Sequence, residues 1–149
     1  MKKIILLDSI RSMQNVGAIF RNADGSGFEK IILTGFTPTP PRGEIGKTAL
    51  GAEDSVIWEY YENPLEIIDI LKKEGYKIYS VELTEDSIDY RTFFGKQEDK
   101  ICLIMGNEVS GVSQELLEIS DKVLMIPMMG KKNSLNVSVA AGIVMYAFV

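Results

Sequence analysis

Five short apolar runs rich in β-branched residues restrict the fold of this chain more than any other feature. The runs occupy residues 3–7, 30–34, 77–83, 100–105 and 122–128. Stretches with helical periodicity lie between and after them, at residues 15–26, 64–74, 113–120 and 136–149. Strands that are apolar along their whole length are typical of a parallel sheet covered by helices on both faces. We therefore predict an α/β fold with five or six strands, a Rossmann-like three-layer sandwich formed by a single domain over residues 1–149.

The charge of the chain is unevenly distributed. The formal net charge is −5, yet residues 1–47 carry seven Lys or Arg against four Asp or Glu, and residues 48–149 carry nine against seventeen. Affinity for a phosphate backbone comes mainly from basic residues that displace counterions, so the net charge argues against a general nucleic-acid binder. Any polyanion is expected to meet the N-terminal third. There the proline-rich stretch 35–51, with Arg42 and Lys47, is predicted to be an exposed functional loop.

The presence of one Cys and no His limits both the chemistry and the compartment of the chain. Cys102 is the single cysteine and lies in an apolar run, so it is predicted to be a buried strand residue of a protein in a reducing cytoplasm. The chain has no His, which excludes imidazole catalysis and, with one Cys, leaves no zinc site; we expect no metal. The apolar stretch from Ile4 to Leu7 ends at Asp8 and is too short for a signal peptide, and no segment reaches membrane-spanning length.

The first and last predicted helices differ in what they must cover. In the first, an apolar stripe should face the core while Arg21 points away from it; the stripe is Val16, Ile19, Phe20 and Ala23. Asn15 stands where this helix would begin, and a helix N-cap is the simpler role for it. The last helix is apolar on almost every side, so a second copy of the chain is predicted to cover part of it.

Two loops follow predicted strands and precede predicted helices, where open parallel sheets bind ligands. The sequence MGNEVSG at 105–111 has neither Walker nor GxGxxG spacing, but its glycines allow a close approach of backbone. In the loop before the last helix, Ser134 or Asn136 would serve as an N-cap if neither had another role. Trp58, Tyr60 and Tyr61 are candidates for stacking on unpaired bases, although strand or core positions are the simpler interpretation.

Three segments together resemble, in order, the signature motifs of the SpoU (TrmH-like) branch of the SPOUT RNA methyltransferases. They are NVGAIFRNADGSGFEKIILTG (15–35), IMGNEVSGVSQELLEISDKVLMIPM (104–128) and SLNVSVAAGIVMYA (134–147). The resemblance spans nearly the whole chain. It implies a parallel-sheet α/β knot, in which the C-terminal part forms a deep trefoil knot whose loops bind S-adenosylmethionine. The cofactor positions that it implies are Glu82, Leu83, Met105, Gly106, Asn107, Gly111, Ile126, Met128, Ser134 and Leu135.

The resemblance also implies a reaction, transfer of a methyl group to a ribose 2′-hydroxyl of RNA. Asn15, Arg21, Glu108, Ser134 and Asn136 match the catalytic and RNA-handling positions of the family, and we expect Arg21, Arg42 and Lys47 to contact RNA. Because a guanidinium is a poor base, Arg21 is expected to orient a phosphate and to stabilise the developing alkoxide. The resemblance further implies a homodimer in which this arginine approaches the partner's cofactor pocket.

Several functional alternatives stay open from the sequence. We favour tRNA over rRNA as substrate, since the chain carries no separate RNA-binding extension and so resembles minimal tRNA-modifying members. A catalytically silent SPOUT-like module that binds RNA or a protein is the competing interpretation, which retention of Arg21 and all three loops disfavours. An ordinary doubly wound nucleotide-binding protein is a third, disfavoured by the absence of phosphate-loop glycine spacing.

Overall fold

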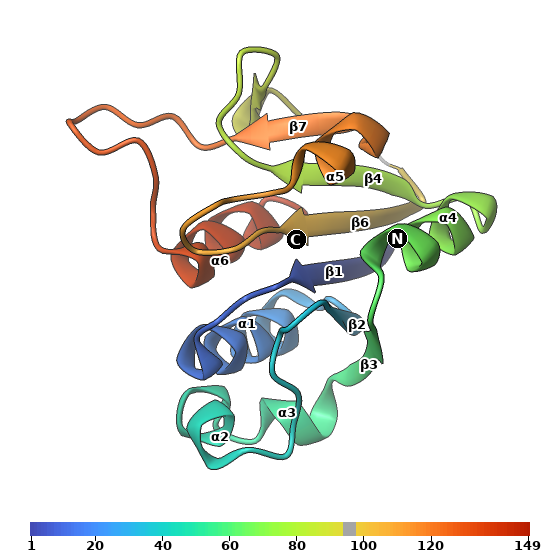
Figure 1. Ribbon diagram of the computed structural model, residues 1–149, viewed down its shortest axis with the longest axis vertical. Helices are drawn as coiled ribbons and strands as arrows, with labels where there is room; N and C mark the ends of the chain where they lie inside the picture. The colour runs from blue at the N-terminus through green and yellow to red at the C-terminus, as the bar shows by residue number, and fades with distance from the viewer. Residues whose placement is uncertain (94–97) are drawn as a thin grey trace.

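One parallel sheet organises the computed structural model, which describes residues 1–93 and 98–149. Within these residues the strand order is β3-β2-β1-β6-β4-β7-β5, and every pairing is parallel. The strands are β1 (Lys2–Asp8), β2 (Lys30–Thr34), β3 (Ile57–Tyr61), β4 (Lys77–Val81), β5 (Ile88–Asp89), β6 (Lys100–Met105) and β7 (Lys122–Met125). Their carboxyl ends therefore meet along one edge of the sheet (Figure 1).

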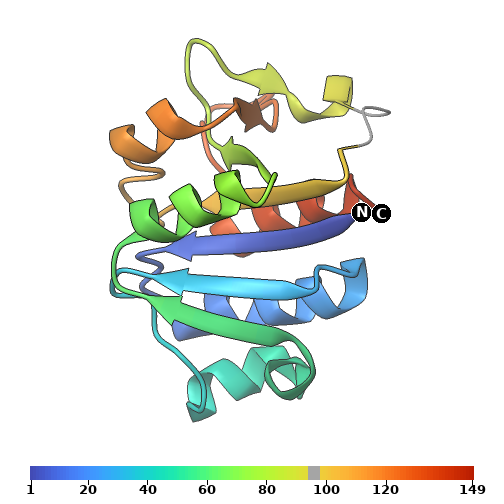
Figure 2. The same cartoon turned by 90° about the vertical axis from the view of Figure 1, so that its right-hand side faces the viewer.

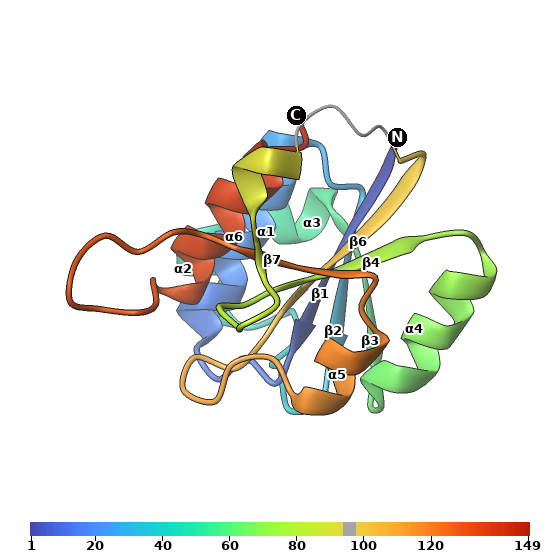
Figure 3. The ribbon, with the colours of Figure 1, turned by 90° about the horizontal axis from the view of Figure 1, so that it is seen from above.

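Helices cover both faces of this sheet (Figures 2 and 3). One face carries α1 (Met13–Ser26), α2 (Gly43–Ala49), α3 (Ala52–Ser55) and α6 (Val137–Tyr146). The other carries α4 (Pro64–Lys73) and α5 (Gln114–Ile119), and a short 3-10 helix, η1 (Tyr90–Phe93), follows β5. In the described part of the chain, no helix combines the length and apolar character needed to cross a membrane.

The predicted sheet is confirmed because successive residues of the central strands bury opposite faces. Ile5 and Leu7 pack with α1 and α6, whereas Ile4 and Leu6 pack with α4 and α5. Each such side chain contributes about 1.5–3 kcal/mol when fully buried. Cys102 is one of these strand residues, and burial raises the pKa of its thiol to about 12. It is therefore a packing residue, as the sequence predicts.

The strand count was predicted too low, since the described residues form seven strands instead of five or six. The additional strands are β3, which has exposed positions, and the two-residue β5. Neither contains a continuous apolar run, because both lie at edges of the sheet, where one side needs no strand partner. The runs at 77–83 and 122–128 end early, at Val81 and Met125, and the following residues line a cavity described below.

The stretch 35–51 is only partly the exposed loop that its prolines predict. Residues 43–49 form α2, which buries Ile45 and Ala49 against α1. The two helices approach so closely at Gly17 that an ideal Cβ there would lie 2.1 Å from Thr48 Oγ1. The i, i+4 spacing of Ile45 and Ala49 was the signal for this helix, and the adjacent prolines and glycines obscured it. The deep trefoil knot stays a prediction.

Candidate functional site

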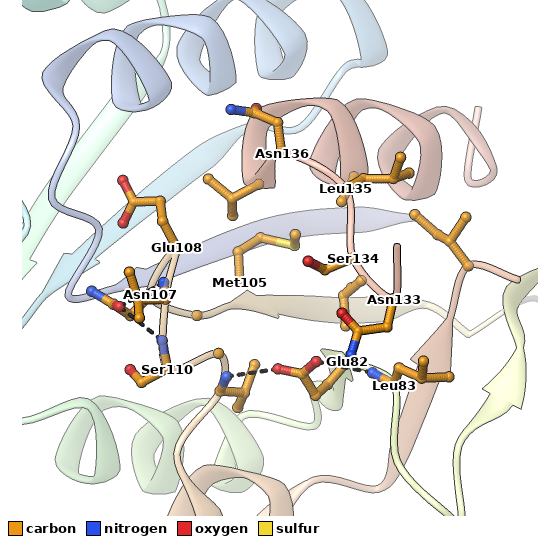
Figure 4. A pocket seen from close by; sticks show the side chains of 18 of the residues that line it. Glu82, Leu83, Met105, Asn107, Glu108, Ser110, Asn133, Ser134, Leu135 and Asn136 are labelled. Atoms are coloured by element: carbon orange, nitrogen blue, oxygen red, sulfur yellow. Dashed lines mark hydrogen bonds between the residues drawn. The ribbon is translucent and has the colours of Figure 1, made fainter. Parts of the chain in front are cut away.

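A cavity of about 600 Å³ opens at the carboxyl edge of the sheet, between the ends of β4, β6 and β7 and the start of α6 (Figure 4). All ten predicted cofactor positions line it: Glu82, Leu83, Met105, Gly106, Asn107, Gly111, Ile126, Met128, Ser134 and Leu135. Glu108 and Asn136 line it as well. These residues come from three segments that are far apart in sequence, and they meet because the neighbouring strands that precede them end at one edge.

The loop after β6 is held by hydrogen bonds within itself. The backbone N–H of Asn107 donates to the carbonyl of Gly111 (3.1 Å), and the N–H of Gly111 donates back to the carbonyl of Asn107 (2.9 Å). The side-chain oxygen of Asn107 accepts the N–H groups of Val109 (2.9 Å) and Ser110 (3.0 Å). These hydrogen bonds fix the shape of the loop.

The fold of the loop itself places a demand on Gly106, in addition to its predicted cofactor role, which stays a prediction. An ideal Cβ on this residue would lie 2.3 Å from the carbonyl carbon of Gly111 and from the amide nitrogen of Val112. The loop itself, folded back on Gly106, therefore requires glycine, whether or not a ligand approaches its backbone. Substitution by a larger residue would open the turn before it could block a ligand.

Glu82 ties the end of β4 to the loop after β6. Its carboxylate accepts the N–H of Val112 (3.0 Å) through Oε2 and the N–H of Leu83 (3.0 Å) through Oε1. Gly111, with φ of +71°, lies so close that an ideal Cβ there would be 2.1 Å from Glu82 Oε2. This clamp joins two walls of the cavity, and the sequence contains no local signal for it because Gly111 and Val112, its partners in the loop, are 29 and 30 residues away.

Glu108, Asn15 and Asn136 form a second link through hydrogen bonds. Glu108 and Asn136 lie on the side of the cavity that faces α1 and α6 (Figure 4). The Glu108 carboxylate accepts the backbone N–H groups of Arg11 and Ser12 (both 2.8 Å) and the side-chain amide of Asn15 (3.1 Å). The amide of Asn136 donates to the side-chain oxygen of Asn15 (3.2 Å). Three of the predicted catalytic residues are thus in one hydrogen-bonded chain.

The two asparagines differ in whether they cap a helix. Helix α1 begins at Met13 with Ser12 as its N-cap, and the Ser12 hydroxyl accepts the N–H of Asn15 (3.1 Å). The N-cap interpretation of Asn15 is therefore wrong, and its side chain is left for the link to Glu108. Asn136 is the N-cap of α6, since its side-chain oxygen accepts the N–H of Ser138 (2.9 Å). Its amide nitrogen still reaches Asn15, so it serves both roles.

The charge of Glu108 follows from its donors. Burial alone would raise the pKa of this carboxyl group, but the N–H groups of Arg11 and Ser12, with that of Asn15, outweigh burial and lower the pKa below its ordinary value. Glu108 is therefore an anion at neutral pH whose oxygens are already occupied by donors. Such a carboxylate positions other groups and is a weak proton acceptor.

The three residues predicted to contact RNA, Arg21, Arg42 and Lys47, lie outside this cavity. Arg21 is exposed on α1 and lines no part of the cavity in its own chain. Arg42 is exposed and directly precedes α2. Lys47 forms an ion pair with Glu44 (2.9 Å), and this contact raises the pKa of Lys47. Ser134 faces the cavity from the loop before α6, across from Met105 (Figure 4).

The cavity suits a sulfonium nucleoside in size and chemistry. Its volume falls in the range of about 300–1,000 Å³ that is common for small-molecule sites. Apolar walls from Met105, Ile126 and Ala140 offer a surface for a purine ring, and the Glu82 and Glu108 carboxylates favour a cationic ligand. These residues therefore fit S-adenosylmethionine. Among residues 1–93 and 98–149, no three His, Cys, Asp or Glu side chains form a group that could hold a metal ion.

Replacing Glu108 by Gln should weaken the link between the loops in a pH-dependent way. At neutral pH we expect the free energy of unfolding to fall by about 1 kcal/mol, because hydrogen bonds to a charged acceptor are lost. The folded pKa is lowered, so this stabilisation is present above the ordinary value of 4.5 and is lost as the pH falls below it. Urea denaturation of both proteins should therefore show a difference that shrinks in acid. The exposed control Glu85→Gln should show no such trend, and a difference independent of pH would contradict the role of the Glu108 charge.

Comparison with known proteins identifies the family of this chain. Residues 2–146 match the model of the SpoU rRNA Methylase family. The chain is 33% identical to the 23S rRNA (guanosine(2553)-2′-O)-methyltransferase RlmP of Bacillus subtilis, covering 97% of this chain and 57% of that protein. It is also 33% identical to the tRNA (guanosine(18)-2′-O)-methyltransferase of Aquifex aeolicus, covering 96% and 66%. The chain thus spans less than two thirds of the length of these curated relatives.

Solved structures show the same fold. An AdoMet-bound rRNA methyltransferase from Sinorhizobium meliloti superimposes with a TM-score of 0.91 at 30% identity, over 98% of this chain and 55% of that one. The A. aeolicus TrmH/SpoU tRNA modifying enzyme gives a TM-score of 0.85 at 31% identity, over 98% and 73%. With the family match over nearly every residue, these similarities show that the chain belongs to the SpoU methylase family.

Proposed function

We propose that this chain catalyses methyl transfer from S-adenosylmethionine to a ribose 2′-hydroxyl of RNA. The observation that carries the proposal is the convergence of all ten predicted cofactor positions on one cavity, with the Glu108–Asn15–Asn136 link beside it. The similar proteins named above, which methylate 2′-oxygens of tRNA or rRNA, support the same reaction. The compartment that we propose is the cytoplasm, where RNA and this cofactor occur together.

The residues of the chain would act mainly by orientation. When bound, S-adenosylmethionine supplies an already activated methyl group. Asn136 and the hydroxyl of Ser134, which line the cavity, and Asn15, which is linked to Asn136 and Glu108, would orient a ribose hydroxyl there. Since the oxygens of Glu108 already accept three hydrogen bonds, we assign no proton transfer to it. The hydroxyl proton would leave to water or to the substrate's own phosphate.

Arg21 would reach a cavity only in a second copy of the chain. It is exposed and does not line its own cavity, although the family resemblance gives it a catalytic role. Helix α6 offers a surface for such a copy. Its buried side includes Val144, whereas Val139 and Tyr146 are 51% and 53% exposed, with the half-buried Ile143 between them. We propose a homodimer in which this apolar stripe is covered and Arg21 of one copy serves the cavity of the other.

The substrate class is proposed as tRNA first and rRNA second. The two curated relatives are equally identical to this chain and act on one class each. Incubation with radiolabelled S-adenosylmethionine and either total tRNA or rRNA, followed by nuclease digestion, should give a label on a ribose 2′-oxygen. Labelling of rRNA alone would reverse the preference. Cofactor binding without labelling of any RNA would favour the catalytically silent alternative.

Arg21→Ala should lower methyl transfer by about 100-fold or more, the scale for losing one preorganised charge-stabilising group. Folding and the affinity for S-adenosylmethionine, measured by calorimetry, should stay nearly unchanged because the side chain is exposed and outside the cavity. Arg21→Lys should recover only part of the rate, since lysine cannot make the planar bidentate contact with a phosphate. Activity of the alanine variant close to that of the parent protein would make Arg21 an ordinary surface charge.

Val139→Glu should dissociate the proposed dimer without disturbing the monomer. The side chain is exposed on α6, so a carboxylate there would be solvated in a monomer but unpaired in the apolar contact. Light scattering at low micromolar concentration should change from dimer to monomer, and methyl transfer should be lost with it. Ile70→Glu, at an exposed apolar position on α4, is the matched control. An active and stable monomer of the parent protein would refute both the interface and the shared site.

A further inference from the structure

A second hollow of about 580 Å³ lies at the carboxyl ends of β2 and β3, and the function proposed above does not use it. Its walls include Arg11, Phe36, Arg42, Trp58 and Tyr60. A third hollow shares Arg11 and Phe36 with it and shares Asn107, Ser110 and Gly111 with the cofactor cavity. The third hollow therefore borders both the second hollow and the cofactor cavity. We call the part of the second hollow formed by Arg11, Phe36, Arg42, Trp58 and Tyr60 the aromatic groove.

Phe36 and Tyr60 present exposed rings to this groove, whereas Trp58 is partly buried and packs against the core on the α1 face of the sheet. Trp58 and Tyr60 are two residues apart on the edge strand β3, so they lie on the same face of the sheet. The Tyr60 hydroxyl donates to the carbonyl of Gly35 (2.6 Å), which holds its ring beside the Phe36 loop. Phe36 is 62% exposed and Tyr60 is 45% exposed. Neighbouring exposed rings that line one hollow point to a binding surface.

Tyr61 is excluded from this set, although its sequence position suggested stacking. It lies on the other face of β3 and packs beside the core that α4 and α5 cover. Its hydroxyl donates to the carboxylate of Glu59 (2.9 Å). This contact raises the pKa of the Tyr61 hydroxyl and leaves the ring in a structural role.

The charges of the groove are positive in a chain of net charge −5. Arg11 and Arg42 both line it, and neither guanidinium forms an ion pair or a hydrogen bond within the part of the chain that the structure describes. Asp8 lines the connecting hollow, where its carboxylate accepts the hydroxyl of Thr34 (2.9 Å). Unpaired guanidinium groups beside exposed rings are the combination that binds the phosphates and bases of unpaired nucleic acid.

We propose that the aromatic groove binds unpaired nucleotides that adjoin the methylated nucleotide, with a base stacked on Phe36 and Tyr60 or Trp58 and phosphates at Arg11 and Arg42. The proposal rests on the function proposed above and specifies its substrate as a single-stranded region, such as a loop. The backbone N–H of Arg11 is bonded to Glu108 (2.8 Å), so the groove has a fixed position relative to the catalytic link. Strand β3, beside the groove, and strand β6, beside the cofactor cavity, are three strand spacings apart, about 14 Å.

Trp58 provides a direct probe, because it is the only tryptophan of the chain. A short single-stranded RNA oligonucleotide of mixed sequence should quench its fluorescence on binding. The same oligonucleotide with abasic positions keeps the phosphates but loses stacking, and a duplex of equal length hides its bases. We expect both to bind about tenfold more weakly, since stacking of one base on a ring has that effect. Equal affinity for all three probes would overturn the proposal.

Substitutions of Phe36 and Arg42 measure the contributions of an aromatic ring and of a positive charge to RNA binding separately. Phe36→Ala should weaken binding of the single strand about tenfold with an unchanged salt dependence. Arg42→Ala should reduce the slope of log affinity against log salt concentration by about 0.7, the value for one lost phosphate contact on a single strand. The matched control for the ring is Ile57→Ala, an exposed apolar position on β3. The matched control for the charge is Lys77→Ala, an exposed position at the amino end of β4, away from the carboxyl ends of the strands. If the controls weaken binding as much as Phe36→Ala and Arg42→Ala, the groove is not the site.

Methyl transfer distinguishes failure of the groove from failure of the proposed function. If Phe36→Ala and Arg42→Ala raise the KM for RNA and leave cofactor affinity unchanged, the groove is supported. If RNA is methylated with an unchanged KM in both variants, the groove proposal fails and the proposed function stands. If no RNA is methylated yet the single strand still quenches Trp58, the proposed function fails and the groove stands as an RNA site. A change of Trp58 emission with protein concentration alone would show that a second copy covers the groove, which would also overturn the proposal.

Discussion

The parallel order of the central strands is the constraint on which the site depends. β1, β6, β4 and β7 lie side by side, so the loops that follow them meet at one edge although they are separated by up to about a hundred residues. Burial of both sheet faces maintains this order, because moving one strand would expose two apolar surfaces at once. The site is therefore a consequence of the packing of the sheet, and the loops need few contacts of their own to stay in place.

Two carboxylates supply those contacts. Glu82 joins β4 to the loop after β6, and Glu108 joins that loop to the start of α1. Both accept backbone N–H groups, which fixes main chain as well as side chain and explains why glycine is needed at Gly111. Acidic residues at a proposed methyl-transfer site are candidates for the general base. Here the hydrogen bonds that they accept indicate that they organise the loops, and the lowered pKa of Glu108 agrees with this role.

The sequence predicted features that depend on local periodicity or on motif order. Continuous apolar runs identified five of the strands, and the family resemblance identified ten of the residues that line the cavity. Edge strands and α2 were missed or underestimated, because a strand with one open side and a helix beside prolines carry weak local signals. The clamp by Glu82 and the requirement for glycine at Gly106 could not be predicted, since both arise from contacts between segments that only the folded chain brings together.

The acidic composition of the chain poses a physical problem for an RNA-modifying protein, because long-range repulsion opposes the approach of a polyanion. The structure suggests how local order can offset it. Arg11 and Arg42 lie beside exposed rings on one edge, while other basic residues such as Lys30, Lys47 and Lys73 are paired with carboxylates. Stacking gains free energy from bases without requiring further positive charge, so a groove of this kind relies less on phosphate contacts than a uniformly basic surface would. A proposed second copy also carries a net charge of −5, so it does not reduce the long-range repulsion. It adds another Arg21 and a further basic N-terminal third to the surface that faces one RNA, which raises the positive charge close to the site.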